Sequence, residues 1–198
     1  MVAIAAIVEG HGEVRALPVL LRRLAEQRGV FDLHLPEPIR VSRDRFLRNE
    51  GEFRRMLLLA GAKAGRGGRI IILLDADDDC PVSLASQVSA RASLLVPNNP
   101  VFVIIANREF EAWLLASAAS LAGRRGLDTG LVAPEDPDKV RDVKGWLSQR
   151  MGASRYREVS DQAALCASVD LDAATASSRS FRKFRKDVID ALEPARTP

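Results

Sequence analysis

Three apolar runs in this sequence each end in carboxylate side chains. The carboxylates, with the runs that precede them, are Glu9 after residues 2–8, Asp75 and Asp77 after residues 69–74, and Glu109 and Glu111 after residues 101–106. Carboxylates that share a site repel one another unless a cation screens them. Ligand sets made of oxygen atoms, without Cys or His, suit Mg²⁺ or Mn²⁺. Such an ion can activate water and stabilise the oxygens of a phosphoryl transfer, so the pattern predicts a metal site for phosphodiester hydrolysis.

The apolar runs have the length and composition of buried strands, and the segments between them have apolar residues at helical spacing. The expected strands are residues 2–8, 33–42 (a weak pattern with two prolines), 69–74 and 101–106, and the expected helices are residues 14–28, 44–64, 82–95 and 110–121. Strands that alternate with helices predict a parallel sheet flanked by helices, which is an α/β fold. Ligands of such sheets bind beyond the carboxyl ends of the strands, where these carboxylates lie.

The alternation of predicted strands and helices ends after residue 122. Residues 123–138 are rich in loop-forming residues, and residues 139–151 and 160–192 have helical patterns without another clear strand. We therefore expect an α/β core at residues 1–122 and a helical C-terminal extension at residues 123–198 that packs on the core.

Two properties of the sequence indicate a cytoplasmic protein. Its two cysteines, Cys80 and Cys166, provide neither a disulfide framework nor the spacing of zinc ligands. The apolar N-terminus has no basic segment before it, so it is interpreted as a strand and not as a signal peptide. No apolar run reaches the roughly 18 residues of a membrane span, so we expect no contact with a membrane.

Basic residues are unevenly distributed, although the net charge is only +3. Residues 40–69 contain nine basic and three acidic residues, and residues 179–186 contain five basic residues and no acid. Basic surface beside an acidic cluster is expected of a metal-dependent site that acts on nucleic acid. Arg182 and Lys183 are therefore candidate phosphate-binding residues, although each basic stretch could also be a solvated helix face.

Some of the acids have simpler explanations. Asp79, like Asp78, could serve in a solvated turn or cap a helix, so it is only an additional candidate for metal binding. Glu13 could stabilise the positive end of the helix that it begins. Glu109 and Glu111 are two residues apart and do not share a helix face, so one of them must point away from the site.

The same residues resemble the Toprim superfamily, which includes topoisomerases, primases and the OLD-family nucleases. Glu9, Gly10 and Glu13 have the E-G-x-x-E form of OLD-type nucleases. Asp75 and Asp77, after a hydrophobic strand, are similar to the second Toprim motif. The segments that look like a stand-alone bacterial Toprim-like family are residues 108–113, 156–162 and 180–184.

The resemblance implies a Toprim-like, Rossmann-like sheet and a two-metal site. It assigns Glu9 to general acid or base chemistry, and Asp75 and Asp77 to metal binding. Glu13 and Glu111 would complete the ligands for Mg²⁺ or Mn²⁺.

The combined features predict a metal-dependent nuclease that acts on nucleic acid, with DNA favoured over RNA. OLD proteins carry an ATPase domain in the same polypeptide, and these 198 residues contain none, so we expect an ATPase partner. The sequence also leaves open that the protein forms a homo-oligomer. The only tyrosine, Tyr156, lies outside the Toprim core, which argues against a covalent tyrosyl intermediate.

The main alternative is a non-enzymatic Toprim-like subunit that binds nucleic acid or a partner. A phosphoacceptor receiver domain or a haloacid-dehalogenase-like phosphatase fits less well, because the acids that each needs would follow the first strand, where the sequence has Glu9 and Gly10.

Overall fold

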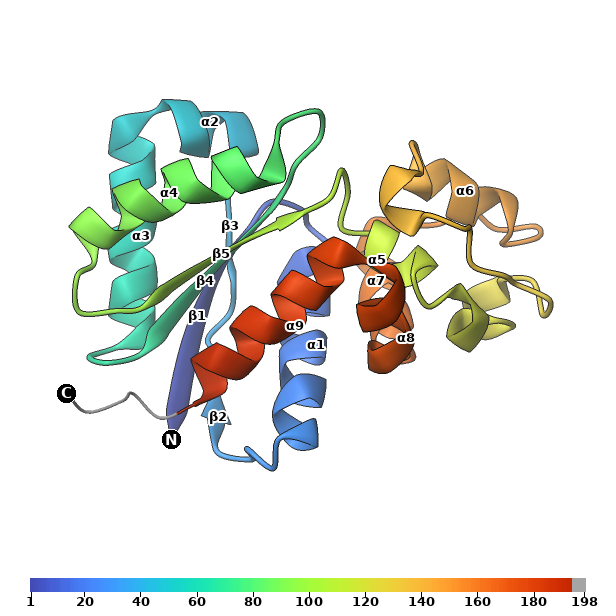
Figure 1. Cartoon of the computed structure of the whole chain (residues 1–198), viewed down its shortest axis with the longest axis horizontal. Coiled ribbons are helices and arrows are strands. Elements are labelled where there is room, and N and C mark those ends of the chain that lie inside the picture. The colour runs from blue at the N-terminus through green and yellow to red at the C-terminus, as the bar shows by residue number, and fades with distance from the viewer. Residues whose placement is uncertain (194–198) are drawn as a thin grey trace.

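Five parallel strands form the sheet at the centre of the computed structural model, which describes residues 1–193. The strands are β1 (Val2–Val8), β2 (Leu33–His34), β3 (Ile39–Arg40), β4 (Arg69–Asp75) and β5 (Val101–Ala106). Their order across the sheet is β2-β1-β4-β5, and β3 pairs with the carboxyl end of β1 (Figure 1). The predicted α/β fold, a parallel sheet flanked by helices, is confirmed.

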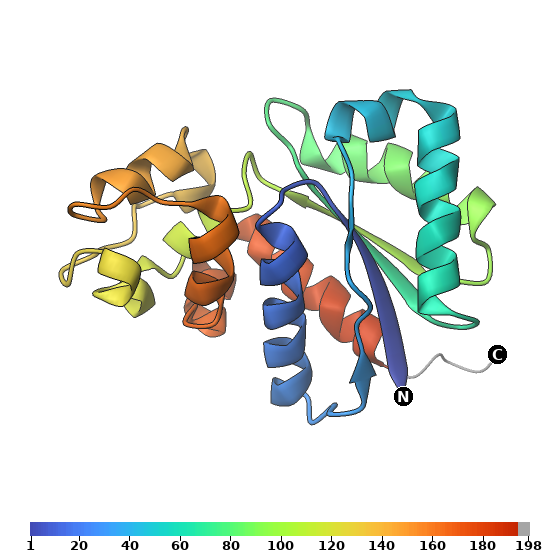
Figure 2. The same cartoon turned by 180° about the vertical axis from the view of Figure 1, so that it is seen from behind.

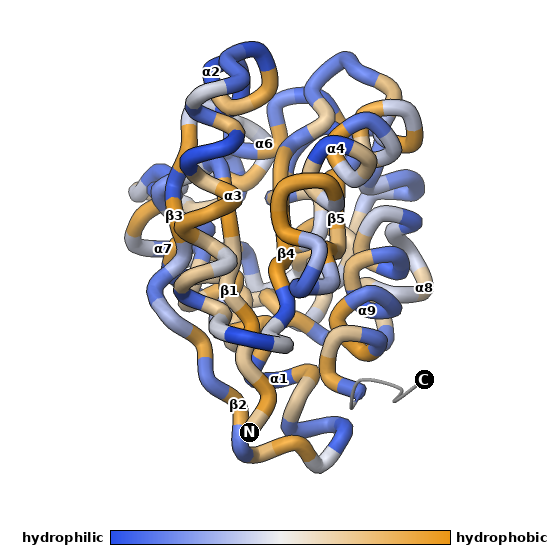
Figure 3. The backbone as a smooth tube through the Cα atoms, turned by 90° about the vertical axis from the view of Figure 1, so that its left-hand side faces the viewer, coloured by the Kyte–Doolittle hydropathy of each residue, from blue (hydrophilic) through white to orange (hydrophobic). Residues whose placement is uncertain are grey.

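Helices cover both faces of the sheet because the central strands are apolar on both sides. The helices on one face are α2 (Arg43–Arg48), α3 (Glu50–Ala64) and α4 (Pro81–Leu95), and those on the other are α1 (Glu13–Gln27) and α9 (Arg179–Leu192) (Figures 1 and 2). Within β4, Ile70 and Ile72 pack with α3 and α4, whereas Ile71 and Leu73 pack with α1 and α9. Figure 3 shows the hydrophobic strands running between the more polar helices.

The remaining helices gather at one end of the molecule, beside the carboxyl ends of the strands (Figure 1). They are α5 (Ala112–Leu115), α6 (Val143–Gln149), α7 (Glu158–Cys166), α8 (Leu171–Ser177) and the 3₁₀ turns Ala118–Leu121, Arg124–Gly126 and Pro137–Lys139. Trp113 of α5 stacks on Phe184 of α9, and its indole Nε1 donates a hydrogen bond of 2.9 Å to Ser180 Oγ. These contacts attach the end helices to the layer that covers the sheet.

Two elements predicted before α4 are wrong in detail. Residues 33–42 form two strands of two residues each in place of one strand, because Pro36 and Pro38 interrupt the ladder between them. The predicted helix 44–64 is broken at Asn49, whose backbone is extended. The Asn49 side chain accepts a hydrogen bond from the Glu52 backbone N–H, so it caps α3.

Two further helices predicted after β5 are also wrong in detail. The segment 110–121 contains only the four residues of α5 and a 3₁₀ turn. The segment 160–192 is divided into α7, α8 and α9, because Asp170 and Ser178 each cap a new helix with their side chains.

The C-terminal part of the chain contributes to the main sheet layers. Helix α9 packs against β5 and α1, and α7 packs against α1. The last five residues of the predicted extension, 194–198, lie outside the described residues. No helix within residues 1–193 has the length and apolar character needed to cross a lipid bilayer.

Candidate active site

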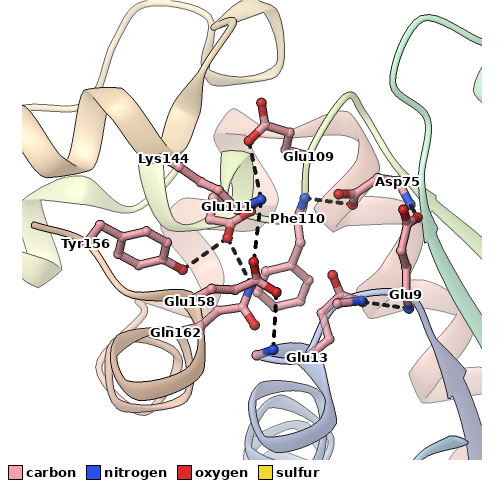
Figure 4. Close-up of polar contacts among 12 residues, drawn as sticks. Glu9, Glu13, Asp75, Glu109, Phe110, Glu111, Lys144, Tyr156, Glu158 and Gln162 are labelled. Atoms are coloured by element: carbon pink, nitrogen blue, oxygen red, sulfur yellow. Dashed lines mark hydrogen bonds and ion pairs between the residues drawn. The ribbon is translucent and has the colours of Figure 1, made fainter. Parts of the chain in front are cut away.

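The adjacent strands β1 and β4 bring two carboxylates to the same edge of the sheet. Val8 pairs with Leu73, so Glu9 and Asp75 follow at neighbouring positions. Glu9 Oε2 lies 3.5 Å from the backbone nitrogen of Asp75, and Asp75 Oδ1 accepts a hydrogen bond of 2.9 Å from the Phe110 N–H (Figure 4). Three strand ends therefore meet at this point, because Phe110 comes shortly after β5.

Glu13 closes the turn between β1 and α1. Its Oε2 accepts hydrogen bonds from the backbone N–H groups of Glu9 at 3.1 Å and Gly10 at 3.2 Å. The side chain is buried, with 3% exposure, as the first residue of its helix. The E-G-x-x-E spacing is thus a backbone turn that holds a buried carboxylate beside Glu9.

Lys144, from α6, is the positive charge at the centre of the cluster. Its Nζ lies 3.2 Å from Glu111 Oε2, 3.7 Å from Glu109 Oε2 and 4.0 Å from Glu158 Oε2 (Figure 4). Both acids that follow β5 therefore reach the site, although one of them was expected to point away. They can do so because they precede α5 and do not share a helix.

Glu111 is the most deeply buried acid of the cluster, with 1% exposure. Its Oε1 accepts hydrogen bonds of 3.1 Å from Tyr156 Oη and from Gln162 Nε2. Within residues 1–193, Glu111 Oε2 and Gln162 Oε1 are buried oxygens with no hydrogen-bond partner. Lys144 Nζ lies 3.2 Å from this Glu111 oxygen.

Two glycines let α7 approach this turn closely. A Cβ atom at Gly12 would lie 2.4 Å from Gln162 Oε1 and 2.7 Å from the Glu158 carbonyl oxygen. A Cβ atom at Gly10 would lie 2.7 Å from Glu158 Oε1, which accepts a hydrogen bond from the Gly12 N–H. Because these positions have no side chain, α7 can approach closely enough for Glu158 and Gln162 to reach the site.

A second acidic group follows β4 and is held by Arg43, whose side chain is 11% exposed. Arg43 Nε donates to the Asp75 carbonyl at 2.9 Å, and its guanidinium pairs with Asp77 at 3.6 Å and with Asp79. Asp77 has a left-handed backbone (φ 51°), which aspartate tolerates better than most residues. A cavity of about 350 Å³ lies between Glu9, Arg43 and Asp77.

Burial and mutual repulsion raise the pKa values of the inner acids. Burial raises the pKa of Glu13 to about 7, opposed by the Gly10 N–H and assisted by the Glu111 charge. Burial, with the charges of Glu13 and Glu111, raises the pKa of Asp75 well above its ordinary value. Burial also raises the pKa of Glu9 and of Glu111. For Lys144, burial lowers the pKa but the charges of Glu111 and Glu109 outweigh it, so the ammonium stays protonated.

The oxygen atoms at this edge fit a hard divalent cation chemically. Glu9, Glu13 and Asp75 present carboxylates without a competing Cys or His, and Glu111 has a buried oxygen without a hydrogen-bond donor. In the part of the chain that is described, no three acidic, imidazole or thiol groups are arranged to hold one ion together. Binding of a cation would therefore require side-chain movement.

Comparison with known proteins assigns the chain to a family. A family model described as a domain of unknown function, DUF4276, matches residues 8–189, which include every carboxylate described above. The chain belongs to the DUF4276 family. A comparison with curated proteins gave no match.

Among solved structures, the DUF4276 chain is similar to C-terminal regions of OLD proteins. For that of Burkholderia pseudomallei, the TM-score is 0.52 at 17% identity, with 96% of this chain and 98% of that chain covered. For that of Xanthomonas campestris pv. campestris, the TM-score is 0.44 at 17% identity, with 96% and 95% covered. The first similarity shows a shared α/β fold.

The structure of this DUF4276 member does not bring all the predicted site residues together. The inner group contains Glu9, Glu13, Asp75, Glu109 and Glu111. Asp77 and Asp79 lie on the outer side of Glu9, where Arg43 holds them.

The two predicted phosphate-binding residues lie on α9. The Arg182 guanidinium donates to the carbonyls of Thr175 and Ala176, and Lys183 pairs with Asp187. No described contact links Arg182 or Lys183 to the carboxylates of the inner group.

Several residues of this DUF4276 site were not predicted as site residues from the sequence. They are Arg43, Lys144, Tyr156, Glu158 and Gln162. Tyr156 and Gln162 lie in a segment that resembles the Toprim-like family, and Arg43 lies in the basic stretch 40–69. Lys144 and Glu158 lie in short helices after long loops, where spacing along the sequence carries no signal.

Proposed function

We propose that this chain is a Toprim-like nuclease that hydrolyses phosphodiester bonds with Mg²⁺ or Mn²⁺. The observation that carries the proposal is the meeting of Glu9, Asp75 and Glu13 at the carboxyl edge of adjacent parallel strands. Buried carboxylates with raised pKa values are costly unless a cation or a proton compensates them, and such groups concentrate at functional sites.

The roles of the residues follow from their positions. Glu9, Glu13 and Asp75 would hold the metal ion, with Glu111 and Asp77 as further ligands on either side. The ion would supply Lewis-acid stabilisation of the phosphate oxygens and activate a water molecule. Glu9 is half-buried with a raised pKa, which suits it to accept a proton from that water. Lys144, two-fifths exposed, would stabilise negative charge on the phosphate.

The proposed substrate is nucleic acid, with DNA favoured over RNA. The resemblance to OLD-type nucleases supports an ATPase on a separate chain as partner. The likeness of nearly the whole chain to the C-terminal region of an OLD protein is consistent with a nuclease module of this kind.

Cleavage of plasmid and single-stranded DNA by purified protein across a series of metals tests the proposal. Asp75→Asn keeps an acceptor for the Phe110 N–H and removes the charge, so cleavage should fall by roughly a hundredfold or more. Cys80→Ser is the matched control, because Cys80 is exposed, close to the acids in sequence and a poor ligand for Mg²⁺. Equal cleavage by wild type and Asp75→Asn would place the activity elsewhere or in a contaminant. Thermal melts establish that each variant is folded.

A specific observation favours the second candidate, a non-enzymatic binding subunit. Arg43 and Lys144 already place positive charge within 4 Å of Asp77 and of three glutamates. Such ion pairs can stabilise the acids without a metal. This alternative is preferred if the protein binds DNA but cleaves nothing with any divalent metal, alone or with an ATPase partner.

A further inference from the structure

A groove of about 470 Å³ lies at the outer edge of the sheet, away from the cavity beside Glu9. It is bounded by the first turns of α4 and α9 and by the carboxyl half of β5. Its apolar lining comes from Val82, Ala85, Val103 and Ile105. Val82 is 78% exposed, so its side chain is available for contact with a ligand.

The groove adjoins the acidic loop that follows β4. Pro81 and Val82 come directly after the segment Asp75–Cys80, and Asn107 lines the groove beside Arg108. The Arg108 carbonyl accepts a hydrogen bond of 3.1 Å from the Asp77 N–H. The groove and the candidate active site therefore lie on the two sides of one loop, at the carboxyl ends of the strands.

The rim of the groove is cationic. Arg179 is exposed, and its guanidinium makes no hydrogen bond or ion pair with any residue among 1–193. Lys183 also lines the groove and pairs with Asp187 on its own helix. The acid in the groove, Asp138, accepts hydrogen bonds from Ser178 Oγ and the Arg179 N–H, so it fixes the start of α9.

The groove has apolar side chains at its base and a positive charge at its edge. It is therefore complementary to a ligand that has a flat apolar part and an anionic part. We propose that the groove is a subsite for one nucleotide of the substrate strand. An unpaired base lies against Val82, Val103 and Ile105, and its phosphate meets Arg179. The volume is within the usual range for small-ligand pockets. This inference rests on the proposed function, because it extends the path of the same substrate.

Binding of single-stranded DNA without added metal tests the subsite directly. The probes are a fluorescein-labelled oligothymidine and an abasic strand of the same length, followed by anisotropy in EDTA. Val82→Asn removes the apolar contact without adding charge, so affinity for oligothymidine should fall about fivefold, and affinity for the abasic strand should not change. Leu94→Asn is the matched control, because Leu94 lies at the other end of α4 and is 83% exposed.

Arg179→Gln should weaken both strands equally and reduce the salt slope by about 0.7, the value for one phosphate of a single strand. The subsite is overturned if wild type binds neither strand, if Val82→Asn matches Leu94→Asn, or if Val82→Asn weakens both strands equally. If the groove binds a partner peptide instead, Val82→Asn should bind DNA as Leu94→Asn does.

The proposed function is measured separately, by wild-type hydrolysis of bis(p-nitrophenyl) phosphate with Mn²⁺, a substrate too small to need the groove. Absence of hydrolysis, alone and with an ATPase partner, with base-selective binding intact would contradict the nuclease and leave the subsite standing. Hydrolysis without base-selective binding would contradict only the subsite.

Discussion

The ammonium Nζ of Lys144 lies 3.2 Å from Oε2 of Glu111, a buried oxygen that has no other hydrogen-bond partner within residues 1–193. The two residues come from α6 and from the segment after β5, so the pair joins the end helices to the sheet. Removing one partner of a buried pair leaves an uncompensated charge, which costs more than the pair itself contributes.

Lys144→Met should therefore destabilise the fold at about pH 8 by roughly 2 kcal/mol, a value reduced because Lys144 is two-fifths exposed. The loss should shrink at acidic pH, because protonated Glu111 no longer needs a cation. Urea denaturation at about pH 8 and about pH 5 measures both values. Lys139→Met, at an exposed pair with Asp136, should have little effect. An equal loss at the two pH values would show that Lys144 acts only through packing.

Glu13 makes stability depend on pH in a defined direction. Its pKa of about 7 in the fold is above the ordinary value of 4.5, so the folded state binds more protons between these values. Stability should fall as pH rises through this window, and Glu13→Gln should exceed wild type by roughly 3 kcal/mol at about pH 8 but not at about pH 4. Chemical denaturation measures this, with the exposed Glu26→Gln on the same helix as control. A constant difference across pH would contradict the burial of an ionisable Glu13.

The close contact between α1 and α7 predicts an intolerant glycine. Gly12→Ala places Cβ 2.7 Å from the backbone carbonyl oxygen of Glu158, so α7 must shift. The expected loss of stability is about 1–3 kcal/mol, as for other overpacked contacts. Gly130→Ala is the control, because no atom lies within 4 Å of a Cβ there. Equal thermal stability of the two variants would show that α7 is not held against this turn.

Arg43 should hold the acidic loop after β4. Arg43→Gln removes the charge that faces Asp77 and Asp79 and weakens the contacts with the Asp75 and Ala76 carbonyls. Hydrogen exchange at residues 76–79 should then become at least about tenfold faster, which corresponds to about 1.4 kcal/mol. Arg45→Gln, at a side chain that is two-thirds exposed, should leave exchange in this loop unchanged. Unchanged exchange in both variants would mean that the turn itself orders the loop.

The parts of the site that could be predicted from the sequence are those at strand ends. Glu9 and Asp75 follow long apolar strands, and parallel pairing of such strands necessarily brings their carboxyl ends to one edge. Asn49 shows a local limit, because its side chain interrupts a continuous helical pattern by capping a new helix.

The contributions of Lys144 and Glu158 could not be predicted, since they depend on tertiary packing. Lys144 lies in a helix of seven residues, and Glu158 begins one of nine. Glu158 reaches the site because α7 packs on α1 across Gly12. Lys144 is tied to the site by its ion pairs with Glu109, Glu111 and Glu158. The separation of Asp77 from Asp75 has a similar cause, because Arg43, 32 residues earlier than Asp75, holds the outer side of the loop.

The most direct test of the central claim is an anomalous difference map from a crystal soaked in Mn²⁺. The proposal predicts a peak bounded by the carboxylates of Glu9 and Asp75, with Glu13 turned toward it, and loss of that peak in Asp75→Asn crystals. A map without a peak at this edge at saturating Mn²⁺, with Lys144 still paired to Glu111 and Arg43 to Asp77, would contradict a metal-dependent active site.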